Sequence, residues 1–168
     1  AFGGDVGHAG VEYGKPEETV MSEHVADIEW NAQAHPQQAD TYSRDHTVTL
    51  ENGHALLNSA APAFLGNPAA SNPETLLLAA LASCHMLTFL AVAAKRGYTV
   101  LRYRDRITGT LGKNADGRMT ITHCVLHPRI EFGGDNVPDA ETLAKLHDSA
   151  HRNCFIANTL NTDFRIET

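Results

Sequence analysis

The fold is decided by residues 72–97, which read NPETLLLAALASCHMLTFLAVAAKRG. Asn72 can cap a helix, Pro73 suits the first helical position, and Glu74 favours the positive end of the helix dipole. A basic pair and a glycine then supply the expected stop. Between these ends apolar residues occur on every side, and such a helix in a water-soluble chain is wrapped by other elements. We therefore predict a central helix that ends at Arg96 and forms the core of the fold or of a dimer.

Short β-type runs precede this helix. Residues 25–31 predict a strand, and residues 43–58 contain two β-type runs on either side of Asn52-Gly53. Because Asn-Gly tolerates the positive φ of a tight turn, these two runs predict a β-hairpin. A loop rich in Ala, Gly, Pro and Asn, residues 59–72, joins the hairpin to the helix.

Two more strands, a helix and a last strand are predicted after the central helix. Apolar and polar side chains alternate over residues 101–111, which predicts a long half-buried strand. Its partner is predicted over residues 118–132, across an Asp-Gly turn at 116–117. A second helix is predicted over residues 139–160, because apolar residues lie along one face of it at spacings of three and four. Residues 162–166 predict the last strand.

The order of these elements predicts an α+β fold. Strands arrive as hairpins and helices arrive singly between them, so antiparallel sheets are expected to pack around two buried helices. The chain shows no βαβ alternation and carries neither a GxGxxG nor a P-loop signature. At 168 residues it is long enough to close a single core.

Charge and composition argue against several classes of protein. Lys and Arg number 13 against 20 Asp and Glu, for a formal charge of −7, which argues against nucleic-acid binding. The one locally basic stretch, at Arg102, Arg104 and Arg106, alternates along the predicted strand and is interpreted as a solvated face. No window of 18 consecutive apolar residues exists, so no membrane-spanning segment is expected.

The N-terminal residues do not resemble a secretory signal, because they have no positive n-region and no continuous apolar core. Met21 opens MSEHVADIEW as a natural start does, so residues 1–20 are either an added leader or an authentic N-terminal arm. Residues 21–168 are expected to form one domain. Three widely spaced cysteines do not suggest a secreted disulfide scaffold, and we therefore expect a cytoplasmic protein.

Two cysteines lie on the predicted helices. Cys84 is about eleven residues into the central helix, and Cys154 is expected on the buried face of the second helix. Free cysteine commonly behaves as a small buried hydrophobe, and the residues alone leave packing and redox chemistry both open. A peroxidatic Cys84 would have to be a thiolate, yet it is too deep in its helix to gain much from the helix dipole. The candidate cations are Arg44 and the histidines.

Three stretches of the chain resemble the OsmC/Ohr family, named for osmotically inducible protein C and organic hydroperoxide resistance. Residues 72–97 are similar to the central helix of that family, and HRNCFIANTL (151–160) is similar to the segment that carries its second cysteine. YSRDHTVTLENGH (42–54) is similar to its N-terminal hairpin. The resemblance extends from about Trp30 to the C-terminus and implies an OsmC-like fold in an intertwined homodimer.

The resemblance also implies an activity and the residues that perform it. In the family the first cysteine is peroxidatic, the second is resolving, and an Arg–Glu pair supports the reactive thiol; these roles fall on Cys84, Cys154, Arg44 and Glu74. The implied function is a thiol peroxidase that reduces organic hydroperoxides, needs no cofactor or metal, and is recycled by an external dithiol. His85 stands where the hydroperoxide-resistance branch tends to have an aromatic residue, so the chain is more similar to the OsmC-like branch.

Helix geometry adds a constraint on this site. Glu74 and Cys84 are ten residues apart, so their Cα atoms lie about 15 Å from each other on a straight helix. Helical side chains lean toward the N-terminus, which turns Glu74 away from Cys84. A shared site therefore requires either a second chain or a sharp bend in the helix. We expect the site at a subunit interface.

Other residues compete less well for a catalytic role. His85 diverges by about 100° from Cys84 on the helix, so packing is its expected role. Cys84, His85, His151 and Cys154 make a two-Cys, two-His set, but only His151 and Cys154 are close in sequence, and no metal site is expected. Cys124 is expected to be structural. Two alternative functions remain: a ligand-binding or interaction module with an inert Cys84, and a cysteine-dependent thioester hydrolase.

Overall fold

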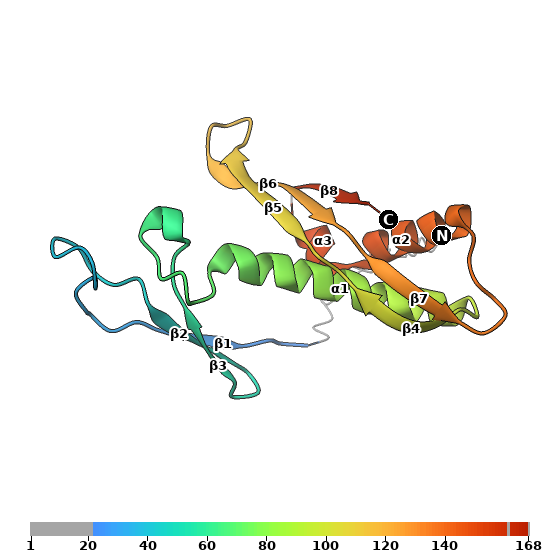
Figure 1. Ribbon diagram of the computed structural model, residues 1–168, viewed down its shortest axis with the longest axis horizontal. Coiled ribbons are helices and arrows are strands. Elements are labelled where there is room, and N and C mark those ends of the chain that lie inside the picture. The colour runs from blue at the N-terminus through green and yellow to red at the C-terminus, as the bar shows by residue number, and fades with distance from the viewer. Residues whose placement is uncertain (1–21, 161, 168) are drawn as a thin grey trace, which may run out of the picture.

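The central helix α1 runs from Pro73 to Lys95 in the computed structural model, which describes residues 22–160 and 162–167. The leader or arm predicted over residues 1–20 lies outside the described residues. The overall class is α+β, as the sequence predicted, with three sheets arranged about α1 and two shorter helices (Figure 1).

Local sequence signals set the two ends of α1. Asn72 Oδ1 accepts a hydrogen bond of 2.8 Å from the backbone N–H of Thr75, which confirms the predicted cap. Glu74 lies in the first turn and Lys95 in the last, each at the end of the helix dipole that favours its charge. The helix is continuous over its 23 residues and ends one residue before the predicted Arg96.

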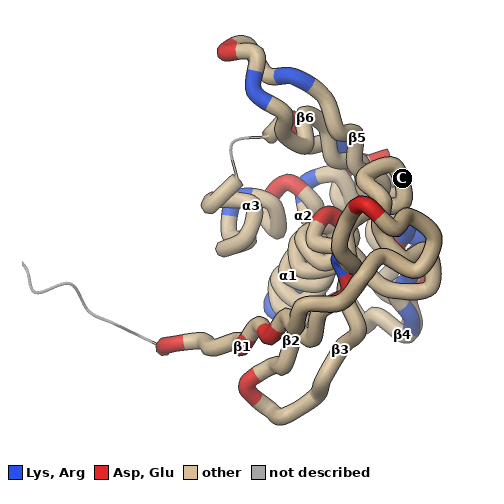
Figure 2. Tube along the Cα trace, turned by 90° about the vertical axis from the view of Figure 1, so that its left-hand side faces the viewer, with Lys and Arg blue, Asp and Glu red and all other residues tan. Residues whose placement is uncertain are grey.

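A single stripe of α1 is buried within this chain. It consists of residues four positions apart: Leu81, His85, Phe89 and Ala93. The opposite flank is apolar and open to solvent, and Leu87 there is 60% exposed. Figure 2 shows charged residues on α1 only near its ends. Elements of this chain therefore cover only one side of the helix, and the predicted alternative, in which a dimer partner covers the rest, stays a prediction.

The N-terminal strands form a separate antiparallel sheet. Its strands are β1 (Ala26–Glu29), β2 (His46–Leu50) and β3 (Ala55–Asn58), in that order. The predicted hairpin is confirmed, and Gly53 at its turn has a φ of 83°, which glycine adopts readily. A short 3₁₀ turn, η1 (Pro62–Phe64), lies in the loop that leads to α1. These strands pack mainly on one another and lie at the end of the molecule away from β4 and β7 (Figure 1).

The two long strands predicted after α1 are four shorter ones. They are β4 (Thr99–Arg104), β5 (Thr108–Lys113), β6 (Met119–Leu126) and β7 (Arg129–Gly133). β4 pairs with β7 in one sheet, and β5 pairs with β6 in another, both antiparallel. The predicted hairpin partners are therefore correct, but the hairpin is divided between two sheets.

The division has a local cause on both strands. Pro128 has no backbone N–H, so it interrupts the ladder between β6 and β7. On the other strand Asp105 follows β4, and its Oδ1 accepts a hydrogen bond of 2.8 Å from the backbone N–H of His127. A side chain thereby takes the place of a strand partner at the break.

The second predicted helix is also divided. α2 runs from Ala140 to Asn153 and α3 from Phe155 to Thr159, and Cys154 between them is not helical, with φ −78° and ψ 113°. The prediction that Cys154 lies within one long helix is therefore wrong. Cys154 instead ends α2 and begins α3, where its Sγ accepts a hydrogen bond of 3.4 Å from the backbone N–H of Ala157.

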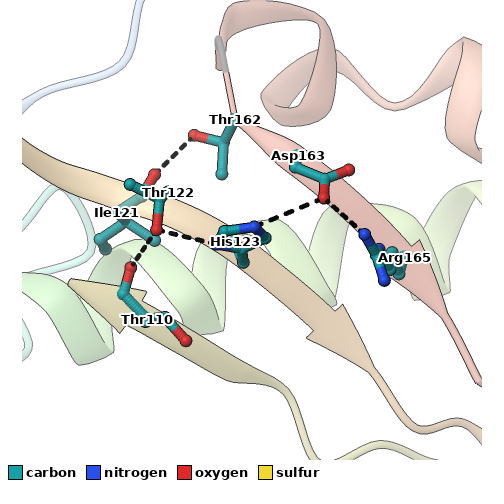
Figure 3. Close-up of polar contacts among 7 residues, drawn as sticks. All are labelled: Thr110, Ile121, Thr122, His123, Thr162, Asp163 and Arg165. Carbon is teal, nitrogen blue, oxygen red and sulfur yellow. Dashed lines mark hydrogen bonds and ion pairs between the residues drawn. The ribbon is translucent and has the colours of Figure 1, made fainter. Parts of the chain in front are cut away.

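The last strand, β8 (Asp163–Ile166), pairs in parallel with β6. The prediction of antiparallel sheets therefore does not hold for this pair of strands. Thr162 Oγ1 donates to the backbone carbonyl of Ile121 at 3.1 Å, and Asp163 lies 3.7 Å from His123 and 3.2 Å from Arg165 (Figure 3). The contacts of Thr162 with Ile121 and of Asp163 with His123 hold β8 on β6, and the Asp163–Arg165 pair lies within β8. Side chains alternate along β8, so Phe164 and Ile166 face the interior.

The length and composition of α1 would also suit a membrane-spanning helix. This does not overturn the sequence expectation of no membrane-spanning segment. A core helix has the same length and composition. In this fold α1 is the central helix and packs against α2, α3, β4, β5 and β6.

Candidate functional site

The core contains two clusters, and the cysteines belong to one of them. The cluster under β5, β6 and β8 consists of the buried residues Leu81, Cys124 and Cys154, with Cys84 packed against it. All three cysteines are free. Cys84 comes from α1, Cys124 from β6 and Cys154 from the junction of α2 and α3. Segments far apart in the sequence thus bring every cysteine of the chain into one region.

Cys84 packs against the cluster that contains Cys154, close enough for the Cys84 thiol to affect the pKa of Cys154. Cys154 is fully buried, whereas Cys84 is only partly so. Burial, followed by the nearby Cys84 thiol, raises the pKa of the Cys154 thiol to about 11. Cys154 is therefore a protonated thiol at neutral pH. The structure brings together the two cysteines that the sequence singled out.

The break between α2 and α3 positions Cys154. Its backbone N–H donates to the carbonyl of His151 at 3.2 Å, which closes the last turn of α2. The extended ψ at Cys154 then turns the chain, and α3 continues along α1.

Cys124 lies in the same cluster as these thiols. It is 1% exposed and shares the cluster with Cys154 and Leu81. Burial raises the pKa of the Cys124 thiol, which disfavours the reactive thiolate. Its expected structural role is consistent with this environment.

Arg44 and Glu74 are not brought to the cysteines within one chain. Arg44 lies before β2, where its guanidinium covers the Tyr42 ring at 4.5 Å and donates to Thr41 Oγ1 at 3.2 Å and to the Tyr42 carbonyl. Glu74 Oε2 is buried and has no hydrogen-bond partner among the described residues. Because α1 is unbroken, about 15 Å of helix separates Glu74 from Cys84.

Arg44 and the start of α1 border the same cavity. This cavity has a volume of about 570 Å³ and is lined mostly by apolar and aromatic side chains: Ile28, Trp30, Tyr42, Arg44, His46, Ala60 and Pro73. Pro73 directly precedes Glu74, so the cation and the carboxylate lie at the same end of α1. The cysteine pair lies further along the helix.

A buried histidine pair lies next to the cysteine cluster, and sequence analysis missed half of it. His85 Nε2 and His147 Nδ1 are 3.1 Å apart, and the two rings are stacked with centroids 5.4 Å apart. Burial, reinforced for His85 by the neighbouring histidines, lowers the pKa of both to about 4. The spacing of His147 and His151, four residues apart on α2, could have revealed this cluster. The packing role expected for His85 agrees with its complete burial.

The comparisons with known proteins point to one family. The profile described as OsmC-like protein matches residues 66–168. An OsmC-like protein of unknown function from Vibrio cholerae O1 biovar El Tor is 41% identical, with a TM-score of 0.81 over 88% of this chain and 99% of that one. No curated protein matches the chain.

More distant structures share the fold. An organic hydroperoxide resistance protein OsmC from Legionella pneumophila is 17% identical, with a TM-score of 0.66 over 89% of this chain and 100% of that one. The organic hydroperoxide resistance protein OhrB of Bacillus subtilis is 21% identical, with a TM-score of 0.58 over 85% and 96% of the two chains. With a profile matching more than half of the chain and a relative this similar over nearly its whole length, the protein belongs to the OsmC family.

Proposed function

We propose that this protein is a thiol peroxidase that reduces organic hydroperoxides, with Cys84 as the peroxidatic and Cys154 as the resolving cysteine. The observation that supports it most directly is the proximity of the two thiols. A resolving cysteine must reach the sulfenic acid formed on its partner, and here no large movement is needed. Membership of a family that includes organic hydroperoxide resistance proteins supports the same reaction.

The reaction balances in three steps. The Cys84 thiolate attacks the distal oxygen of ROOH, the O–O bond breaks, and the alkoxide takes a proton and leaves as ROH. Cys84 is then a sulfenic acid, and the Cys154 thiol attacks its sulfur to form a disulfide and release water. An external dithiol reduces the disulfide and restores both thiols. The free cysteines of the structure correspond to the reduced state, and we place the cycle in the reducing cytoplasm.

A second copy of the chain supplies the cation that stabilises the Cys84 thiolate. Within one chain Arg44 lies at the far end of α1 from Cys84, and the helix does not bend. The exposed apolar flank of α1 and the exposed Ile28 and Trp30 of the N-terminal sheet offer surfaces that a partner would cover. In a two-fold dimer, Arg44 and Glu74 of each chain would then serve the other chain's Cys84.

The cavity around Arg44 favours organic peroxides over hydrogen peroxide. Its walls include Ile28, Trp30 and Tyr42, and such walls stabilise an apolar substituent while the guanidinium attracts the peroxide group. Hydrogen peroxide has no apolar part to gain from this environment. The preference is therefore expected in KM more than in the chemical step.

A peroxide-consumption assay with a dithiol tests the proposal. Wild-type protein should consume more than one equivalent of cumene hydroperoxide per chain only when the dithiol is present, and Cys84→Ser should abolish the reaction. Cys124→Ser is the matched control and should retain activity. Activity in Cys84→Ser, or turnover of a thioester without any dithiol in the wild type, would refute the peroxidase assignment.

A further inference from the structure

A second pocket lies between α2 and β8, away from the cavity around Arg44. Its volume is about 250 Å³, and its lining consists of Ala144, His147, Asp148, His151, Phe164 and Ile166. Phe164 and Ile166 reach the pocket because side chains alternate along β8, and Asp163 and Arg165 are exposed on the other side of the strand (Figure 3). A cavity of about 150 Å³ holds benzene, so this pocket has room for a substituted ring.

His147 gives the pocket a buried polar atom without a partner. The residue is only 3% exposed, and its Nδ1 is engaged with His85 Nε2 at 3.1 Å. Its Nε2 has no hydrogen-bond partner in the described part of the chain, and neither does Nδ1 of His151. A buried polar atom is normally hydrogen-bonded, so both nitrogens favour a ligand that supplies a partner.

The histidine pair determines what that partner must be. A neutral imidazole has one N–H and one lone pair, and the contact between His85 and His147 uses one of each. When His85 Nε2 donates to His147 Nδ1, the proton of His147 is on Nε2, which is then a donor. When His147 Nδ1 donates to His85 Nε2, His147 Nε2 carries no proton and is an acceptor. A hydroxyl group can both donate and accept, so it matches His147 in either arrangement.

The charges around the pocket favour an uncharged ligand. Burial lowers the pKa of His147 to about 4, so its ring is neutral at pH 7. Asp148 is ion-paired with Arg152, four residues along α2. An anion would lie against a carboxylate and a neutral ring, and a cation would meet a carboxylate that already has a partner. Neither charge would be compensated, and burying an uncompensated charge is unfavourable.

The pocket adjoins the cysteine cluster. A smaller cavity of about 100 Å³ lies behind it, with Leu81 and Cys124 among its lining residues. His151 and Phe164 line both spaces, and their rings are stacked with centroids 4.3 Å apart. A single stacked pair thus separates the pocket from the residues that pack around Cys154.

We propose that the pocket between α2 and β8 binds an uncharged molecule that carries a hydroxyl group on an apolar body. His147 Nε2 and His151 Nδ1 bind the hydroxyl, and Ala144, Phe164 and Ile166 contact the apolar part. The identity of this ligand rests on the proposed function, because the hydroperoxide ROOH and the alcohol ROH of that reaction are both uncharged molecules with a hydroxyl group on an apolar body. The pocket then holds substrate or product one stacked ring pair away from the small cavity that Leu81 and Cys124 line, outside the cavity around Arg44 where the reaction is proposed.

Binding is measured in Cys84→Ser protein, which cannot turn over peroxide, so the result does not depend on whether the wild type is a peroxidase. 2-Phenyl-2-propanol and cumene hydroperoxide are titrated separately while the histidine Cε1–H signals are followed by NMR. Saturable shifts of His147 and His151 are expected with both probes. Tighter binding of the hydroperoxide would identify a substrate site, and tighter binding of the alcohol a product site. Benzoate and benzylamine, which are similar in size but charged, should produce no such shift.

A variant that fills the pocket provides the decisive comparison. Ala144→Leu leaves the histidines in place and should weaken binding of the alcohol by about tenfold or more, because the larger side chain occupies the site. Ala140→Leu, on the same helix but outside the lining, should bind as the parent does. The proposal is overturned if the shifts do not saturate, if benzoate shifts the same signals, or if Ala144→Leu binds equally well. Wild-type protein that binds the alcohol but lacks peroxidase activity would refute the proposed function and leave this site standing.

Discussion

Cys84 and Cys154 differ in their access to solvent, and this difference suits the two roles proposed for them. Cys84 is partly exposed, so a hydroperoxide can approach it, whereas Cys154 is completely buried. The pKa of Cys154, raised to about 11, keeps it protonated beside its partner. It therefore does not compete for peroxide and is in place when the sulfenic acid forms.

The thiol count after oxidation checks these roles. One equivalent of cumene hydroperoxide should consume two thiols per chain and leave Cys124 free, as measured by thiol titration and intact mass. In Cys154→Ser, the Cys84 sulfenic acid has no resolving thiol and should oxidise further, with a mass gain of two or three oxygen atoms when peroxide is in excess. A Cys84–Cys124 disulfide in oxidised wild-type protein would show that the resolving residue has been misassigned.

The His85–His147 pair predicts a loss of stability in mild acid. Both pKa values are lowered from 6.5 to about 4 in the folded protein, so between these values the unfolded chain binds more protons. The contribution of the neutral pair is fully present above about pH 6.5 and decreases as the pH falls toward 4, by a few kcal/mol in all. Urea unfolding at pH 7 and pH 5 measures it. His147→Phe should flatten this dependence, and His54→Phe, in an exposed turn, should not.

At the scale of elements, the sequence predicted regular segments well and their interruptions poorly. The cap at Asn72 and the Asn-Gly turn are local signals, and both are confirmed. The apolar spacing of α2 continues past Cys154, so it concealed the break there. Alternation likewise continues through Asp105, and Pro128 on the opposite strand was the only local sign that the sheet divides. Interruptions that depend on contacts from distant segments leave little trace in local periodicity.

The same limit applies to the candidate site. Family resemblance identified Cys84 and Cys154, which the structure brings close together. No residue pattern showed that proximity, because 70 residues of chain lie between them. His147 was missed because its partner His85 lies on another helix. The spacing of His147 and His151 marks one side of the cluster, but the pairing of His147 with His85 on another helix is visible only when the packing of the helices is known.

The N-terminal sheet determines how Arg44 can act. Its strands pack mainly on one another, so it presents Arg44 at a distance from its own Cys84. Arg44→Ala should therefore slow peroxide reduction at pH 7 by removing the cation that we propose for the Cys84 thiolate, and higher pH should partly restore the rate. Arg44→Lys should recover only part of the activity, because an ammonium group cannot make the bidentate contact with Glu74 that we propose for the guanidinium in the dimer. The measurement is the rate of peroxide reduction as a function of pH. If Arg44→Ala reacts at the wild-type rate at pH 7, a residue other than Arg44 supplies the cation.

At the scale of the whole molecule, a single chain leaves two sets of complementary surfaces uncovered. The apolar flank of α1 is exposed at Leu87, and the N-terminal sheet exposes Ile28, Trp30 and Leu57. In the two-fold dimer that we propose, burying both sets would bring Arg44 and Glu74 of one chain to Cys84 of the other. Stability and catalysis would then depend on the same contact between chains.

Mixing two inactive variants tests this arrangement. Glu74→Ala and Cys84→Ser proteins, unfolded together and co-refolded, should regain activity, because the mixed dimer holds one site with both residues intact. With random assortment about half of the dimers are mixed, so the mixture should reach about a quarter of the wild-type activity per chain. Each variant refolded alone is the control. Mixed dimers without activity would mean that one chain supplies the entire site.

The parallel pairing of β8 with β6 has a consequence for the order of folding during synthesis. Phe164, on β8, packs against the cysteine cluster and stacks on His151, and Ile166 closes the pocket beside it. These walls cannot form until the ribosome has translated and released the last strand. Until β8 has paired, Cys124 and Cys154 lack the cover that Phe164 gives them. A chain without β8 would therefore leave both thiols open to oxidants and would expose an apolar cluster that quality control can recognise.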